Sequence, residues 1–170
     1  AYFGKWHLDG YQERDGRAVF HRVPRQRRGG FDTWLGYENN NAQYDTWLHG
    51  HTGEEEVEQH RLEQYETDAL TDLLLRHVEE RAEDGAPFFA VLSAQPPHNP
   101  YVAPAEWMGR HTPEGVQLRP NVPPVDWVRE RALRELAGYY GMIENLDWNV
   151  GRLMEALRVR GLYDQTHIIF

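Results

Sequence analysis

Apolar residues recur at helical spacing in two segments of the chain. The first segment carries four of them: Leu70, Leu73, Leu74 and Val78. Residues three and four positions apart lie on one face of a helix, so this stripe predicts an amphipathic helix with one buried face. We expect it to begin near Thr67, with Thr67 or Asp68 as its N-cap, and to end at Asp84-Gly85.

The second segment is longer and covers about residues 125–160. Its apolar positions keep the same spacing throughout: Leu133, Leu136, Tyr140, Ile143, Leu146, Val150, Leu153 and Leu157. This period predicts one long helix or two nearly collinear ones. Gly161 is well suited to the position just after the last turn.

The apolar or charged character of four further segments predicts their secondary structure. Residues 88–92 form a continuous apolar run, which predicts a strand buried on both faces, with helices on two sides of the sheet. Residues 167–170 would return to that sheet as a parallel strand. Residues 43–49 are rich in aromatic and β-branched types and predict an edge strand closed by Gly50. The acidic residues 54–58 then read as a solvated loop.

The remaining segments read as loops. Residues 2–41 are rich in glycine, arginine and aromatic residues without a helical period, which predicts loops and short extended pieces. Residues 96–124 contain many prolines, which predict a long, stiffened surface connection. The order strand, loop, helix, strand favours an α/β fold. Because no repeat or low-complexity tract divides the chain, we interpret residues 1–170 as a single partial domain.

Composition narrows the possible classes of protein. A chain of 170 residues with 40% hydrophobic content can form one domain with a real core. Its 18 basic and 27 acidic residues give a formal charge of -9, which argues against a general nucleic-acid binder. It has no cysteine, and no apolar run approaches the roughly 18 residues of a membrane span. The chain begins without methionine inside a motif and ends in an apolar run, so we expect an internal fragment of a longer protein.

The string Gly4-Lys5-Trp6-His7-Leu8 is the most informative short motif. Alternate residues of an extended chain point the same way, so Lys5 and His7 would face one site together. An ammonium and an imidazole side by side suit an oxyanion, because the first is a permanent charge and the second exchanges a proton near neutral pH. On spacing alone, a surface lysine beside a packed histidine is the favoured interpretation of the string.

His98 follows the predicted buried strand, in the turn Pro96-Pro97-His98-Asn99-Pro100. Open α/β sheets place functional groups just beyond the carboxyl ends of their strands, and the prolines restrict the backbone here. A histidine held in this way suits a general acid, although a histidine in a turn can equally be structural.

Other polar residues are weaker candidates. Asp45, His49 and His51 could suggest a metal-ligand cluster, but a solvated or sugar-facing loop explains them as well, and we expect no metal site in this chain. Three residues of the long helix read as its polar face or as buried hydrogen-bond partners: Glu144, Asn145 and Asp147.

Taken together, these motifs closely resemble the type I sulfatases, which are arylsulfatase-like members of the alkaline phosphatase superfamily. The resemblance runs from end to end in the order of the family. It is carried by Gly4-Lys5-Trp6-His7-Leu8, Arg27-Arg28-Gly29-Gly30-Phe31-Asp32-Thr33-Trp34, Pro87-Phe88-Phe89, Pro97-His98-Asn99-Pro100-Tyr101, Tyr139-Tyr140, Ile143-Glu144-Asn145-Leu146-Asp147 and residues 151–157. One local departure is Asp9, where many relatives have glycine.

The resemblance implies a large mixed sheet flanked by helices, a formylglycine nucleophile made from Cys or Ser, and a bound calcium ion. By similarity, Lys5 would bind the sulfate and the formylglycine oxygen. His7 would assist the hydrated aldehyde when sulfate is eliminated. His98 would contact the ester and protonate the leaving oxygen, and the adjacent Asn99 would contribute to substrate binding.

The motifs for the nucleophile and for the calcium ligands are absent from these residues. We therefore expect this fragment alone to be inactive, to hold calcium only weakly, and to self-associate through open sheet edges. The intact protein would hydrolyse a carbohydrate or aryl sulfate ester. Two alternatives stay open at this point: a phosphonate or phosphate ester hydrolase of the same superfamily, and a catalytically dead sugar-binding module.

Overall fold

The computed structural model describes residues 1–14 and 17–170 and divides into two compact units. The first unit comprises residues 1–95 and 149–170, and the second comprises residues 96–148. No described helix is long and apolar enough to cross a membrane.

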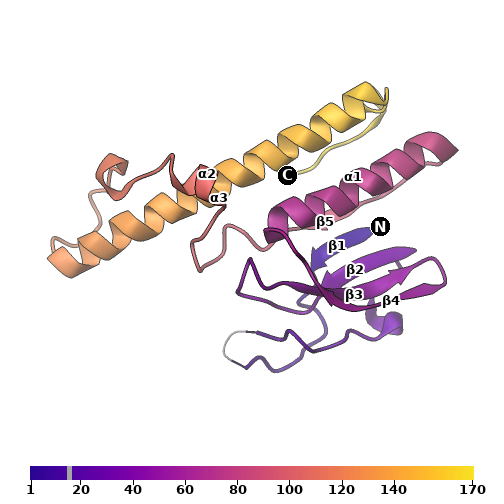
Figure 1. Ribbon diagram of the computed structural model, residues 1–170, viewed down its shortest axis with the longest axis horizontal. Coiled ribbons are helices and arrows are strands. Elements are labelled where there is room, and N and C mark those ends of the chain that lie inside the picture. The colour runs from indigo at the N-terminus through magenta and orange to yellow at the C-terminus, as the bar shows by residue number, and fades with distance from the viewer. Residues whose placement is uncertain (15–16) are drawn as a thin grey trace. The chain divides into compact units, whose positions relative to one another are not determined.

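A five-stranded mixed sheet forms the centre of the first unit (Figure 1). Its strands are β1 (Tyr2–Lys5), β2 (Thr33–Tyr37), β3 (Trp47–Thr52), β4 (Glu55–Arg61) and β5 (Val91–Ser93). The order across the sheet is β4-β3-β2-β1-β5. β1 is parallel to β2 and β5, whereas β3 is antiparallel to β2 and β4. The predicted α/β fold with a mixed sheet and flanking helices is thus confirmed.

The two faces of the sheet are covered differently. Helix α1 (Glu66–Asp84) packs on the face that carries Phe3, with Leu74 and Val78 in the shared core. Successive residues of a strand point to opposite faces, so Tyr2 lies on the other side, against Val23 and Trp34. In the described residues this second face is covered by a loop that includes the short helix η1 (Arg25–Arg27), so the expectation of helices on both sides was wrong for this segment.

Helix α1 confirms the predicted amphipathic helix. Gly85 ends it in the left-handed conformation, and its N–H bonds to the carbonyl of Arg81 at 3.0 Å. The predicted N-cap was wrong: Tyr65 occupies that position without a side-chain cap. The helix begins earlier because the N–H of Glu66 is already satisfied by the carbonyl of Gln43, at 2.9 Å.

Helix α3 (Asp126–Val159) confirms the second predicted helix as one continuous element. Its last turns pack beside α1, where Leu157 is buried against Leu74. Three polar pairs connect this part of the chain to α1: Asp68 with Asn149, Asp72 with Arg152, and Glu79 with Arg160. In these pairs the residue numbers increase together along α1 and along this part of the chain, so the two helices run in the same direction. Gly161 follows with the expected positive φ of 68°.

The predictions for residues 43–58 need correction. β3 begins at Trp47 and is an interior strand, because β2 and β4 pair with its two sides. Gly50 does not close it but lies inside it, where a Cβ atom would stand 1.7 Å from the carbonyl oxygen of Trp34. The acidic run is the edge strand β4 rather than a loop: its side chains are largely exposed, so it lacks the apolar alternation of a half-buried strand.

The two predicted apolar strands also differ from the structure. The ladder between β1 and β5 covers only three residues of each strand, so residues 88–90 precede it and only Val91–Ser93 form a strand. The residues of β5 are only partly buried, so the prediction of a strand buried on both faces was wrong, and the strand lies at the edge of the sheet. Residues 167–170 pair with no described strand, and Ile169 and Phe170 are 94% and 100% exposed. They follow the short helix η3 (Tyr163–Gln165).

The second unit confirms the proline-rich connection, which includes helix α2 (Ala105–Met108) and the short helix η2 (Pro113–Gly115). Its core comprises Ala103, Trp107 and Met142, which bring the connection onto α3. Gly138 permits a close approach, because a Cβ atom there would lie 2.3 Å from the carbonyl oxygen of Tyr101.

Candidate functional site

The candidate site of the first unit lies at the carboxyl edge of the parallel strands. β1, β2 and β5 run in the same direction, so Lys5, Tyr37 and Ser93 end their strands at one edge of the sheet. The residues that follow, among them Glu38 and Gln95, are buried and polar. Open α/β sheets bind ligands at this edge.

Lys5 ends β1 as a partly buried ammonium group. Burial lowers its pKa, and the carboxylates of Glu13, Glu66 and Glu38 oppose that shift, in decreasing order. The negative charges of these carboxylates favour the protonated, cationic form of Lys5.

His7 lies two residues further on, beyond the end of the strand. Its φ is 52°, so the expectation that it alternates with Lys5 along an extended chain was wrong in its geometry. Its backbone N–H bonds to the carbonyl of Glu38 at 2.8 Å, and its Nε2 lies 2.9 Å from Oε1 of Glu13. Glu13 therefore contacts the imidazole, and its negative charge also acts on the Lys5 ammonium.

Asp9, the departure from the family pattern, is part of the support for this loop. Its side chain is inaccessible to solvent and lies 2.9 Å from Nε of Arg27 and 2.5 Å from Nε2 of His21. Its backbone N–H donates to both carboxylate oxygens of Glu38, at 3.0 and 3.2 Å. The aspartate thus ties the segment after His7 to the ends of β2 and η1.

Glu66 is a fully buried carboxylate behind the same edge. Its Oε1 accepts hydrogen bonds from the hydroxyl of Tyr37, at 2.7 Å, and from the N–H of Gln95, at 3.0 Å. Its Oε2 accepts one from the hydroxyl of Thr46, at 2.7 Å. One side chain thereby joins the ends of β2 and β5, the start of α1 and the segment before β3.

His98 and Asn99 belong to the second unit, whereas Lys5 and His7 belong to the first. His98 is exposed, and its Nδ1 lies 2.7 Å from the carbonyl oxygen of Asn99. A carbonyl only accepts, so Nδ1 carries the proton in this contact. The ring is thereby oriented within its turn by the next residue of the chain.

The residues considered as metal ligands have other partners. Asp45 pairs with Arg17 at 2.8 Å and with Arg61 at 2.9 Å. Nε2 of His49 accepts the N–H of Val23 at 2.9 Å, and both nitrogens of His51 have partners. Residues 1–14 and 17–170 contain no group of three or more His, Cys, Asp or Glu side chains that could hold a metal ion.

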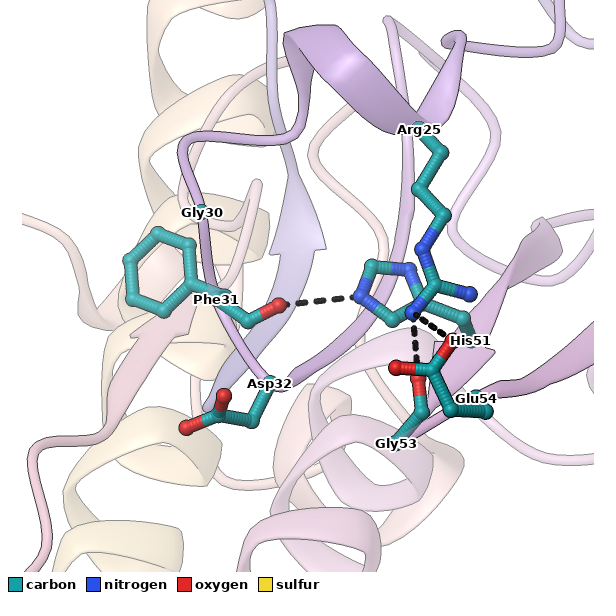
Figure 2. A pocket seen from close by; sticks show the side chains of 7 residues that line it. All are labelled: Arg25, Gly30, Phe31, Asp32, His51, Gly53 and Glu54. Atoms are coloured by element: carbon teal, nitrogen blue, oxygen red, sulfur yellow. Dashed lines mark hydrogen bonds and ion pairs between the residues drawn. The ribbon is translucent and has the colours of Figure 1, made fainter.

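A pocket of about 260 Å³ lies at the opposite, amino-terminal end of β2 (Figure 2). His51 forms part of its wall and lies 2.9 Å from the carbonyl oxygen of Phe31. The guanidinium of Arg25 bonds to the carbonyl of Gly53 and lies 3.6 Å from the carboxylate of Glu54. These groups satisfy one another at the end of the sheet away from Lys5, so this pocket is not the candidate catalytic site.

Comparisons with known proteins connect the sequence and fold of this chain to one class of enzyme. The sulfatase family model matches residues 1–170. An ulvan-active sulfatase from Formosa agariphila is 33% identical over 183 residues, covering 100% of this chain and 31% of the relative. An endo-4-O-sulfatase from Bacteroides thetaiotaomicron is 26% identical over 193 residues, covering 100% of this chain and 36% of the relative.

The solved structure of yidJ from Bacteroides fragilis superposes with a TM-score of 0.76 at 25% identity, covering 96% of this chain and 38% of that one. The fold is therefore that of the sulfatases within the alkaline phosphatase superfamily. The chain belongs to the sulfatase family, as its motifs predicted. It spans about a third of the length of the curated relatives that it matches.

Sequence reasoning identified Lys5, His7, His98 and Asn99 as candidates but missed the carboxylates around the first two. Glu38 directly follows β2, and a polar residue at the carboxyl end of a strand is a signal that was available. Glu13 and Glu66 gave no such signal, because their roles depend on contacts with residues 6 and 29 positions away.

Proposed function

We propose that the full-length protein is a sulfuric ester hydrolase that releases sulfate from a carbohydrate or aryl sulfate ester. The observation that carries the proposal is the family match across the whole chain, with Lys5 and His7 at the carboxyl edge of its sheet. The names of the two curated relatives, an ulvan-active sulfatase and an endo-4-O-sulfatase, favour a sulfated polysaccharide over a simple aryl ester.

In this proposal the nucleophile is a formylglycine made from Cys or Ser outside these residues. The chain has no cysteine, and Ser93 is followed by Ala-Gln-Pro-Pro rather than by the x-Pro-x-Arg pattern of the family. Calcium belongs to the same outside part. Among the described residues no acidic or histidine cluster suits a metal ion, so no step is assigned to the ion here.

The contribution of this chain is to hold the anion and to move protons. Lys5 binds the sulfate, because it ends β1 at the carboxyl edge and its ammonium stabilises negative charge on the transferring group. His7 exchanges a proton with the attacking group when sulfate leaves, with Glu13 orienting its Nε2. His98 donates a proton to the leaving oxygen, and Asn99 contributes a hydrogen bond to the substrate.

The test is sulfate release by the full-length protein from sulfated oligosaccharides and from nitrophenyl sulfate. We expect turnover that falls by a factor of about 100 or more in Lys5→Ala, because an electrostatic contact with the transition state is lost. Faster release of phosphate from phosphate or phosphonate esters would favour the other hydrolase class. Tight sugar binding without release of either anion would identify a binding module instead.

A further inference from the structure

A hollow of about 310 Å³ lies in the second unit, beside the turn that carries His98. Two of its lining residues, Asn99 and Pro100, come from that turn, and Tyr101 directly follows it. The other two, Arg134 and Glu135, come from α3. The hollow therefore begins one residue after the histidine proposed to act on the ester. No role is given to Arg134 by the family motif or by the proposed mechanism.

The wall formed by the turn is fixed to the helix by close packing. The carbonyl oxygen of Tyr101 approaches Gly138 so closely that any larger residue there would collide with it. The ring of Tyr101 also meets that of Tyr139 edge to face, with centroids 5.8 Å apart. A wall held by the backbone and by an aromatic contact is preorganised, which reduces the entropy cost of binding a ligand.

The charges that line the hollow are not balanced. The carboxylate of Glu135 accepts a hydrogen bond from Nε of Arg131 at 2.7 Å, so it already has a cationic partner. Arg134 is exposed, and within residues 1–14 and 17–170 its side chain has no hydrogen-bond or ion-pair partner. A guanidinium in this state offers planar, paired donors that match a carboxylate or a sulfate group.

We propose that Arg134 and Asn99 form a subsite for a second anionic group of the substrate, a carboxylate or sulfate on a sugar next to the one that is desulfated. This inference rests on the proposed function and narrows it. The preferred substrate is a polyanionic glycan, whereas an aryl sulfate with a single anionic group leaves the subsite empty. Arg134 thus determines specificity and takes no part in bond breaking.

The test compares the full-length protein with Arg134→Ala, using a sulfated oligosaccharide that contains a uronate and, separately, nitrophenyl sulfate. Loss of one charge-assisted contact is expected to raise KM for the oligosaccharide about tenfold and to leave kcat and the kinetics with nitrophenyl sulfate unchanged. Arg129→Ala is the matched control, because Arg129 is an exposed arginine of the same helix that does not line the hollow.

Calorimetric binding of the same oligosaccharide gives a readout that does not depend on turnover. A Kd about tenfold higher in Arg134→Ala than in Arg129→Ala supports the subsite. Because the contact is electrostatic, this difference between the two variants should become smaller at high salt. Equal KM and Kd values in the two variants would overturn it, whatever the catalytic activity. Failure of the unaltered protein to release sulfate, with the difference in Kd preserved, would refute the proposed function but not the subsite.

Discussion

The hydroxyl of Tyr37 donates a hydrogen bond of 2.7 Å to the carboxylate of Glu66, and neither side chain is accessible to solvent. Tyr37 is the register partner of Lys5 across the parallel ladder. Its carbonyl accepts the N–H of Trp6 at 2.7 Å. The buried carboxylate therefore holds the strand end against which the Lys5 backbone is aligned.

The same carboxylate makes stability depend on pH. Burial raises the pKa of Glu66 above its ordinary 4.5, despite the hydrogen bonds from Tyr37 and Thr46. A raised pKa in the folded state stabilises the fold fully below pH 4.5, and this contribution is lost as pH rises through the folded value. The measurement is urea unfolding of the protein and of Glu66→Gln, which does not titrate at this position. As pH rises from 4.5 through the folded pKa of Glu66, the unfolding free energy of the unaltered protein should fall relative to that of Glu66→Gln. A constant difference would contradict the assignment.

His49 should act in the opposite direction. Its Nε2 accepts the N–H of Val23, so protonation of that nitrogen breaks a buried hydrogen bond. Burial, followed by the nearby charge of Arg28, lowers the pKa of His49 from 6.5 to about 4. The stability it contributes is present above pH 6.5 and is lost as pH falls toward 4, by up to about 3 kcal/mol.

The measurement for His49 is thermal or urea unfolding between pH 7 and pH 4, with His49→Gln as the comparison. Glutamine keeps an acceptor for Val23 but does not titrate, so its acid destabilisation should be smaller. His60→Gln serves as a control, because His60 is an exposed histidine on β4. Identical acid profiles for all three proteins would show that His49 does not titrate in this range.

In the full-length protein, His98→Ala should reduce the rate more for esters with poor leaving groups than for nitrophenol-like ones. Only the poor leaving groups need a proton in the transition state, so the loss should increase with leaving-group pKa. The measurement is kcat/KM across a series of aryl and sugar sulfates. Equal losses along the series would exclude His98 as the general acid.

Substitution of two glycines of α3 by alanine should change the stability of the protein in opposite directions. In Gly138→Ala the new methyl group would stand 2.3 Å from the carbonyl oxygen of Tyr101, so the turn must move, at a cost of about 1–3 kcal/mol. Gly151 has nothing within 4 Å, and Gly151→Ala should stabilise the helix by about 0.5–1 kcal/mol. Chemical denaturation measures both, and a neutral Gly138→Ala would show that the close approach is not required.

Local sequence patterns predicted the elements that can be recognised from the spacing of their own side chains. The stripes of α1 and α3 encode one buried face each, and Gly85 and Gly161 mark their ends, so both helices were predicted with small errors. The motif residues Lys5, His7 and His98 were also found from the sequence, although their roles stay a proposal.

Features that depend on distant partners were not predicted. β4 is a strand only because β3 lies beside it, and its own glutamates resemble a loop. From the sequence, Gly50 was predicted to end a strand. In the structure it lies inside β3, where the lack of a side chain allows the carbonyl of Trp34 to approach. Glu66 is a polar residue in the first turn of a helix, and nothing in its neighbourhood along the chain shows that three donors converge on it.

The unequal edges of the sheet limit how a polypeptide of these 170 residues can assemble. β4 forms one edge and is lined with charged side chains: Glu55 is exposed, Glu56 pairs with Arg25 and Arg28, and Glu58 pairs with Arg22. Charged side chains along an edge oppose pairing with a second copy. β5 forms the other edge, and Val91 and Leu92 add no charge to it. A symmetric pair formed through β5 covers that edge in both copies and leaves the two charged β4 edges outside. Self-association should therefore stop at a dimer, and sedimentation that revealed open-ended polymers would show that the charged edges do not terminate growth.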